Sequence, residues 1–340
     1  MANIAAPPRP ANIASGPPAH APRALDASPH KPPPWEADAM QDSDPIRLPG
    51  PWTHRDITAN GARFHVAELG EGPLVLFLHG FPEFWWSWRH QLPAVAEAGY
   101  RAVAVDLRGY GGSDKTPRGY DPLTLTMDVT GVIRALGQSN ATLVGHGWGA
   151  FLGWTAAVFR PAAVNRLAVT GSAHPRRLRQ GLLTDPKQIS AARFMWSAQR
   201  PWAPEKALTR DAAMLVEQLL AEWGATGWPE LDVAQRYRDA MLVPGAAHSS
   251  LEYYRWLIRS LVRPDGMRYA QRMRTEIRVP VLHLQGELDS ALLPHVARGS
   301  GRYVTAAYRW RLLEGIGHFA HEEAPMRFNN ELIDWLKSSS

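Results

Sequence analysis

The fold of this chain is decided by the stretch Leu143-Val144-Gly145-His146-Gly147-Trp148-Gly149-Ala150. An apolar run over residues 141–144 ends in this glycine-rich segment, and a helix-like run follows over 150–159. Glycines at alternate positions let a strand and a helix approach closely, and the corner residue of such a turn usually has a positive φ. The stretch therefore predicts a strand, a sharp turn at Gly147 and a helix, which is the context of a nucleophile elbow.

The elbow pattern Gly-x-nucleophile-x-Gly carries a reactive side chain at its central position. Here that position is Gly147, which has no side chain and cannot attack a substrate. The chain contains no cysteine, which excludes a thiol nucleophile, disulfides and zinc sites with cysteine ligands. The sequence thus combines the scaffold of a catalytic turn with an empty central position.

Strand-like and helix-like segments alternate on both sides of this corner. Alternating residues on either side of Asn60-Gly61 predict a hairpin. Short apolar runs predict buried parallel strands, and periodic segments between them predict helices. We expect strands at 54–58, 63–68, 73–78, 101–107, 141–144, 164–170, 279–285 and 308–313, and helices at 86–98, 123–136, 150–159, 293–299 and 325–336. This alternation indicates an α/β protein with a parallel sheet.

The chain divides into four segments. Residues 1–50 are rich in proline and alanine and predict a disordered tail. The tail is interpreted as a spacer or a start-site artefact, with a proline-rich ligand for a partner domain as the alternative. The α/β pattern occupies 51–173 and resumes over 268–340. Between them, 174–267 shows helical periodicity, clearest as an amphipathic helix at 212–223, and predicts an inserted helical cap.

Composition limits the classes of function. The 340 residues are 45% hydrophobic and 20% charged, as in a soluble globular protein with a sizeable core. The formal charge of +5 is spread along the chain, so we expect no nucleic-acid partner. No apolar run is long enough to span a membrane and no signal-peptide pattern is present, so we expect a cytoplasmic protein. We also expect no nucleotide cofactor and no metal, since neither kind of motif has the required spacing.

Five motifs follow one another in an order similar to that of the α/β-hydrolase superfamily, and more narrowly of its epoxide hydrolase and haloalkane dehalogenase branch. The resemblance extends from about Trp52 to the C-terminus. It implies a mostly parallel eight-stranded sheet flanked by helices, with an inserted helical cap. Besides the elbow, the motifs are His79-Gly80-Phe81-Pro82, the loop over 106–114, Gly286-Glu287-Leu288-Asp289 and Gly317-His318-Phe319.

The resemblance implies roles for particular positions. In this branch the elbow carries an aspartate that forms an ester with the substrate, and water activated by a His–Asp pair then hydrolyses the ester. The base position matches His318, and the residue that orients the imidazole matches Asp289. Backbone N–H groups of Phe81 and Trp148 would form the oxyanion hole, although a packing role for Trp148 is an equal alternative.

Substrate contacts are also implied by the resemblance. In epoxide hydrolases two cap tyrosines donate hydrogen bonds to the epoxide oxygen. Tyr254 resembles one of them, with a packing role as its alternative. The upstream match places Phe194 where the second is expected, and a phenyl ring keeps the packing but donates no hydrogen bond. His79 and Pro82 are further candidates for substrate contact.

Three functional hypotheses remain. The first is an epoxide-hydrolase-like enzyme that acts on a small apolar substrate, in which His318 activates a water lodged in the space left by Gly147. The second is a catalytically silent relative that binds an apolar small molecule or a partner. The third is a haloalkane dehalogenase or an ester hydrolase, each of which would also need a side-chain nucleophile. The sequence indicates no particular oligomeric state.

Overall fold

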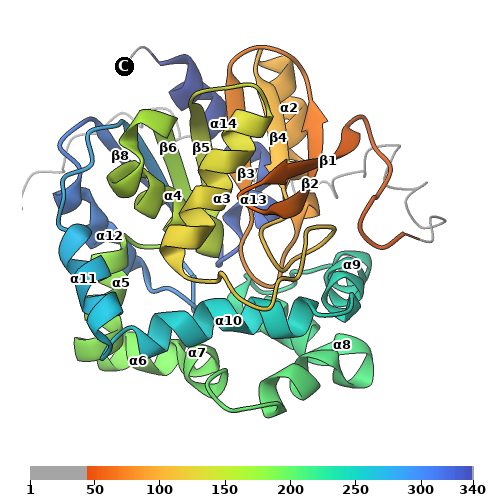
Figure 1. The fold of residues 1–340 in the computed structure, drawn as a ribbon, viewed down its shortest axis with the longest axis vertical. Helices are drawn as coiled ribbons and strands as arrows, with labels where there is room; N and C mark the ends of the chain where they lie inside the picture. Colours follow the sequence, from red (N-terminus) through yellow and green to blue (C-terminus); the bar gives the residue numbers. More distant parts are fainter. Residues whose placement is uncertain (1–43, 339–340) are drawn as a thin grey trace, which may run out of the picture.

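The computed structural model describes residues 44–338, and an eight-stranded sheet runs through its centre (Figure 1). The strand order is β1-β2-β4-β3-β5-β6-β7-β8, in which β2 is antiparallel to both of its neighbours and all other pairs are parallel. The strands are β1 (Thr53–Ala59), β2 (Ala62–Leu69), β3 (Leu74–Leu78), β4 (Arg101–Val105), β5 (Ala141–His146), β6 (Val164–Thr170), β7 (Val281–Gly286) and β8 (Tyr308–Leu313). The predicted α/β class and the predicted strands are confirmed.

Helices cover both faces of the sheet, which explains why the central strands are buried throughout. Every residue of β3 and of β5 is buried. The helices α3 (Pro122–Ala135) and α4 (Gly147–Phe159) pack together on one face, and α2 (Gln91–Glu97) and α14 (Pro325–Lys337) pack together on the other (Figure 1). These elements match predicted helices, apart from the start of α2.

The helix predicted over 86–98 is divided. A short 3₁₀ helix, η2 (Trp85–Trp88), precedes α2. Pro93 explains the break, because proline has no N–H to donate to the carbonyl of Arg89 and its ring would clash there. The other short elements are η3 (Pro161–Ala163), α12 (Pro294–Arg298), η4 (Gly299–Tyr303) and α13 (Ala320–Glu323).

A run of helices joins β6 to β7, and most of it lies across one end of the sheet (Figure 1). The amphipathic helix predicted from 212 is the second part of α8, because residues 211–213 have φ values of 50°, 53° and 60° and interrupt its first part. Tyr269 of α11 hydrogen-bonds Thr155 of α4 across 2.7 Å, so the last helix of this run packs on the core. The helices are α5 (Pro175–Thr184), α6 (Pro186–Ala191), α7 (Arg193–Ser197), α8 (Ala203–Trp223), α9 (Leu231–Leu242), α10 (Ala246–Arg259) and α11 (Pro264–Arg272).

The expected tail boundary at residue 50 must be corrected. Ile46 and Leu48 are buried in the core. Their backbone carbonyls accept hydrogen bonds from two indole N–H groups, at 2.7 Å from Trp85 and 2.9 Å from Trp52. The apolar side chains and the tryptophan donors together fix this segment on the sheet. The rest of the predicted tail, residues 1–43, lies outside the described part of the chain.

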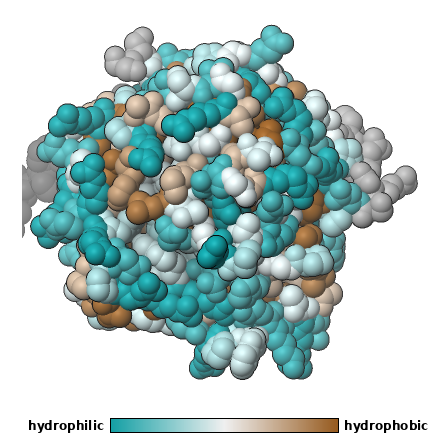
Figure 2. Space-filling view, viewed as in Figure 1, coloured by the Kyte–Doolittle hydropathy of each residue, from teal (hydrophilic) through white to brown (hydrophobic). Residues whose placement is uncertain are grey.

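Apolar surface is mostly turned inward. Figure 2 shows polar side chains over most of one face, with apolar ones in scattered patches. Within residues 44–338, no helix has the length and apolar character needed to cross a membrane.

Candidate active site

The elbow forms as predicted. β5 ends at His146, and α4 begins at Gly147 with a φ of +49°. The flanking glycines are required by close approach: a Cβ on Gly145 would lie 2.5 Å from the backbone N of Ala150, and a Cβ on Gly149 would collide with a backbone carbonyl of β3. The turn therefore places Gly147 at the end of the sheet that faces the helices between β6 and β7.

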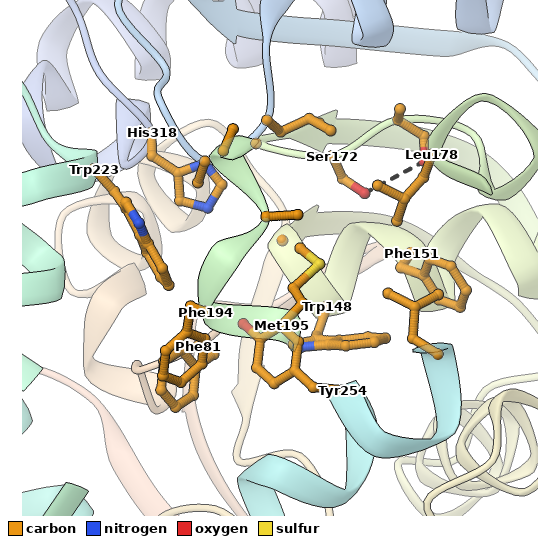
Figure 3. A pocket seen from close by; sticks show the side chains of 18 residues that line it. Phe81, Trp148, Phe151, Ser172, Leu178, Phe194, Met195, Trp223, Tyr254 and His318 are labelled. Carbon is orange, nitrogen blue, oxygen red and sulfur yellow. Dashed lines mark hydrogen bonds between the residues drawn. The ribbon is translucent and has the colours of Figure 1, made fainter. Parts of the chain in front are cut away.

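A cavity of about 60 Å³ lies between this corner and the helices that join β6 to β7 (Figure 3). Its volume exceeds the roughly 10–15 Å³ needed to hold one water molecule. Its walls are mainly apolar, with a hydroxyl at Ser172 and at Tyr254 and one imidazole, that of His318. Residues 174–267 contribute Leu178, Ala191, Ala192, Phe194, Met195, Trp223, Tyr254 and Leu257, and the rest of the chain contributes Phe81, Gly147, Trp148, Phe151, Gly171, Ser172, Ala173, Ala291, Leu292 and His318.

The structure brings His318 and Asp289 together. Nδ1 of His318, in the loop after β8, lies 2.9 Å from Oδ2 of Asp289, in the loop after β7. The other carboxylate oxygen accepts hydrogen bonds from the backbone N–H groups of Ala291 and Leu292, at 3.0 and 2.8 Å, and Oδ2 also accepts one from the Gln285 amide. These donors fix the carboxylate, and the carboxylate in turn fixes the orientation of the imidazole.

Two opposing effects set the protonation of His318. Burial favours the neutral ring, but the charge and hydrogen bond of Asp289, together with the charges of Glu83 and Glu323, outweigh burial, so the pKa of His318 lies above its usual value. Nδ1 is engaged by Asp289, which leaves Nε2 for a ligand. Nε2 makes no hydrogen bond to another residue within 44–338, and the ring lines the cavity (Figure 3).

Two backbone donors lie at the same corner. Trp148 is in the first turn of α4, where a helix offers no internal acceptor to the N–H group. Phe81 lies in the loop after β3, the strand beside β5. Neither N–H group donates to a backbone or side-chain acceptor in the described part of the chain. Both residues line the cavity, as the predicted oxyanion hole requires.

Aromatic rings form one wall of the cavity. Phe194 is stacked on Phe81 with ring centroids 5.0 Å apart, and Tyr254 stands perpendicular to both rings, at 5.3 and 5.4 Å. Burial raises the pKa of Tyr254, although a hydrogen bond with Trp148 opposes this, so the hydroxyl stays protonated at neutral pH. The predicted pair, Tyr254 and Phe194, is therefore placed side by side at the cavity (Figure 3).

The expected substrate contacts of His79 and Pro82 must be corrected, because both are buried outside the cavity lining. Nε2 of His79 accepts a hydrogen bond from the backbone N of Leu107 at 3.0 Å, and Nδ1 lies 2.7 Å from the carbonyl oxygen of Gly80. Since both ring nitrogens have backbone partners, His79 joins the loop after β3 to the loop after β4. Its role is structural.

Sequence spacing also missed a buried group of two histidines and a carboxylate. Nδ1 of His146 lies 2.6 Å from Oε2 of Glu83, and Nε2 of His321 lies 3.0 Å from Oε1 without the alignment of a hydrogen bond. All three side chains are fully buried, and they are residue types that can bind metals, although no sequence motif with metal-ligand spacing indicated them. Glu83 directly follows the motif at 79–82, and His321 lies three positions after His318, which were the available signals.

Hydrogen bonding already engages this carboxylate. Oε2 of Glu83 also accepts the backbone N–H of Gly80 at 2.7 Å. Burial alone would raise the pKa of Glu83, but the two imidazoles hold it well below its usual range. Burial also lowers the pKa of His146 to about 4, against the attraction of Glu83. A neutral imidazole that donates to a carboxylate accounts for this geometry, and it ties the loop after β3 to the elbow.

Comparison with known families agrees with this architecture. Residues 73–325 match the model of the alpha/beta hydrolase fold family. Epoxide hydrolase 3 of Xenopus tropicalis is 34% identical over 82% of this chain and 76% of its own length. The AB hydrolase superfamily protein YfhM of Bacillus subtilis is 30% identical over 83% of this chain and 97% of its own length.

Solved structures give the same result. The crystal structure of epoxide hydrolase A from Mycobacterium thermoresistibile superposes with a TM-score of 0.74 at 28% identity, and the match covers 84% of this chain and 98% of that one. An epoxide hydrolase from Bacillus megaterium, solved with an inhibitor, matches equally at 0.74 with 29% identity, over 84% of this chain and 100% of that one. The chain therefore belongs to the α/β-hydrolase superfamily, with epoxide hydrolases among its relatives.

Proposed function

We propose that this protein adds water to an epoxide, or to a similar small apolar substrate, without forming a covalent intermediate. The observation that carries the proposal is the buried pair of His318 and Asp289. Asp289 engages Nδ1 of His318, and the imidazole lines the same cavity as Gly147, where Nε2 can act on a ligand. In the family that the sequence resembles, an aspartate occupies the position of Gly147. We infer that glycine removes the nucleophile and leaves room for water in its place.

The reaction that fits these groups is a direct attack by water. Nε2 of His318 takes a proton from a water beside Gly147, and the water oxygen forms a bond to an epoxide carbon while the carbon–oxygen bond of the ring breaks. Tyr254 donates its hydroxyl proton to the departing oxygen and regains a proton from His318 afterwards. The N–H groups of Phe81 and Trp148 stabilise negative charge as it develops. The product is a vicinal diol, and no atom of the protein enters it.

The cavity walls support a small apolar substrate. Phe81, Phe194 and Trp223 enclose one side with ring centroids 5.0 to 6.2 Å apart, so they offer apolar contact and few polar partners. A tyrosine hydroxyl facing this wall gives the substrate oxygen one donor. The second donor position is taken by Phe194, and we expect slower ring opening for that reason.

The test is a single-turnover incubation of styrene oxide with the protein in water labelled with oxygen-18. We expect diol above the uncatalysed level, label in the diol, and no label in the protein. Label in the protein would show a covalent ester and contradict the proposed route. His318→Ala is the control for background hydrolysis, and it should reduce diol formation to the uncatalysed rate. Halide-release and nitrophenyl ester assays test the dehalogenase and esterase alternatives.

A second candidate is a silent relative that binds an apolar small molecule or partner. It is favoured by one observation, the absence of a side chain at Gly147, because loss of a nucleophile usually costs several orders of magnitude in rate. This candidate predicts that styrene oxide is never turned over, even at high protein concentration. Diol that depends on His318 would exclude it.

A further inference from the structure

The corner at Gly147 brings together hydrogen-bond donors and the partial positive charge of a helix N-terminus. The thirteen-residue helix α4 begins there, and the N-terminus of a helix carries a partial positive charge and N–H groups without internal acceptors. The N–H groups of Trp148 and Phe81 have no acceptor within the described chain. These backbone groups alone do not define a binding site, because any helix N-terminus beside a loop offers similar donors.

His318 is a second and independent observation. Its side chain is more than nine-tenths buried and lines the cavity, yet Nε2 has no partner within residues 44–338. The hydroxyl of Ser172, which also lines the cavity, has only a long contact of 3.5 Å, to the carbonyl of Ala173. Nε2 of His318 and the Ser172 hydroxyl are thus polar atoms at the cavity wall with unused hydrogen-bonding capacity, which points to a ligand with polar atoms, and to acceptor atoms when the ring is protonated.

No acidic group of the described chain balances these donors inside the cavity. The lining residues include no aspartate or glutamate. The carboxylate of Asp289 is held on the other side of the imidazole by its own hydrogen bonds. At Gly147 itself there is space, because a Cβ would have only the Cα of Gly80 within 4 Å outside its own helix and its chain neighbours, at a distance of 3.4 Å.

We propose that the space beside Gly147 is a carboxylate-binding subsite, and that the protein binds small monocarboxylic acids whose apolar body lies against Phe81, Phe194 and Trp223. One carboxylate oxygen accepts from the backbone N–H groups of Phe81 and Trp148, and the other accepts from Nε2 of His318. The apolar walls select one negative charge on a hydrophobic body, since burying a doubly charged and strongly hydrated phosphate or sulfate there costs more. The subsite overlaps the proposed water position but does not depend on turnover.

The protonation of His318 decides which occupant the subsite accepts. Burial lowers its pKa, and Asp289, Glu83 and Glu323 raise it, with a net increase. The ring of His146 packs edge-on at 4.7 Å and has a pKa of about 4, so it is neutral above that pH. Below the raised pKa of His318 the imidazolium therefore attracts an acid, and above that pKa the neutral ring accepts a proton from water. Acid binding and hydration should have opposite pH dependences.

The test compares phenylacetate with phenylacetamide, a neutral molecule of the same shape, by calorimetry on the full chain without epoxide. We expect phenylacetate to bind at least about tenfold more tightly near pH 6, and the preference to disappear near pH 9. His318→Gln keeps the size of the side chain and should remove the preference while phenylacetamide binding persists. Equal affinity for the two molecules, or a preference unchanged in His318→Gln, would overturn the proposal.

Further measurements distinguish a carboxylate site from a general anion site and from the proposed hydration. Gly147→Asp places a carboxylate of the chain in the subsite and should abolish phenylacetate binding, whereas Gly147→Ala fills less space and should retain part of it; near-ultraviolet circular dichroism checks that both variants fold. Chloride that displaces phenylacetate at equal concentration would show a general anion site and overturn the assignment to acids. Phenylacetate binding without any epoxide turnover would leave this proposal standing and refute the proposed function alone.

Discussion

Gly147 and Gly80 face each other across the elbow, and a Cβ on Gly147 would lie 3.4 Å from the Cα of Gly80. That distance is an ordinary contact, so the loop after β3 leaves room for a side chain at the corner. The backbone of Gly147 has a positive φ of +49°, as is usual for the corner residue of such a turn. The fold therefore has room for a side chain at this position, where the sequence has glycine.

Gly147→Asp should create covalent epoxide hydrolysis. The carboxylate would meet a preformed pair of His318 and Asp289, and we expect the turnover rate to rise by about 10³-fold or more. Labelled water should now introduce oxygen-18 into the protein, as measured by mass spectrometry after a single turnover. The positive φ costs a non-glycine residue about 1–2 kcal/mol, so the free energy of unfolding should fall by that amount.

Gly147→Ala is the matched control for this change. It bears the same backbone strain but has no nucleophile, so it should lose similar stability and gain no covalent label. If the parent protein already hydrates epoxides as fast as Gly147→Asp, then glycine is no handicap, and the inference that a nucleophile is missing fails.

The pH dependence of hydration should report the His318–Asp289 pair. Because the pKa of His318 is raised, the neutral ring that accepts a proton becomes common only above that pKa, and the rate should rise with pH through it. Asp289→Asn removes the charge that raises the pKa, so the midpoint of the profile should move to lower pH. The maximal rate should also fall, by about 10²-fold or more, because the ring loses its fixed tautomer. A midpoint that does not move would contradict the assignment.

Tyr254 and Phe194 should differ in what they add to ring opening. Tyr254→Phe removes the donor to the departing oxygen, and we expect kcat to fall by about 10²-fold with little change in KM. Phe194→Tyr adds a hydroxyl beside it and should raise kcat. Steady-state kinetics with styrene oxide separate the two parameters. A change in KM alone in either variant would assign these rings to packing.

The fold could be predicted because its signals are local. The apolar runs of β3, β5 and β6 are buried on both faces, so hydrophobicity alone marks them. The corner at Gly147 was visible because close approach demands glycine on both sides of it. The pairing of His318 with Asp289 came from the order of motifs, and the parallel strands β7 and β8 bring the two loops to the same end of the sheet.

What escaped prediction depends on partners far apart in the sequence. The places of Glu83 and His321 next to two motifs do not show that His146 and His321 converge on the Glu83 carboxylate. His79 looked available for substrate, but both of its nitrogens are taken by backbone groups of two loops. Ile46, in a proline-rich context typical of a tail, is buried against the core. In each case tertiary contacts override the local composition.

Buried neutral histidines should make the protein sensitive to mild acid. Burial keeps the pKa of His174 and of His283 at about 3, whereas an imidazole in the unfolded chain titrates near 6.5. Between these values the unfolded chain binds protons that the folded chain does not, so the free energy of unfolding falls as the pH drops from about 6.5 towards 3. At pH 5 each of the two should cost at most about 2 kcal/mol relative to neutral pH.

His174→Asn tests whether the buried imidazole of His174 causes part of this acid sensitivity. Nδ1 of His174 accepts a hydrogen bond from the backbone N of Arg176 at the start of α5, and an asparagine oxygen can serve as the same cap without titrating. Urea unfolding at pH 7 and pH 5 should show a smaller loss of stability in this variant than in the parent. His248→Asn, which removes an imidazole that is 56% exposed, is the control. If His174→Asn loses as much stability between the two pH values as the parent does, the acid sensitivity lies elsewhere and His174 does not contribute to it.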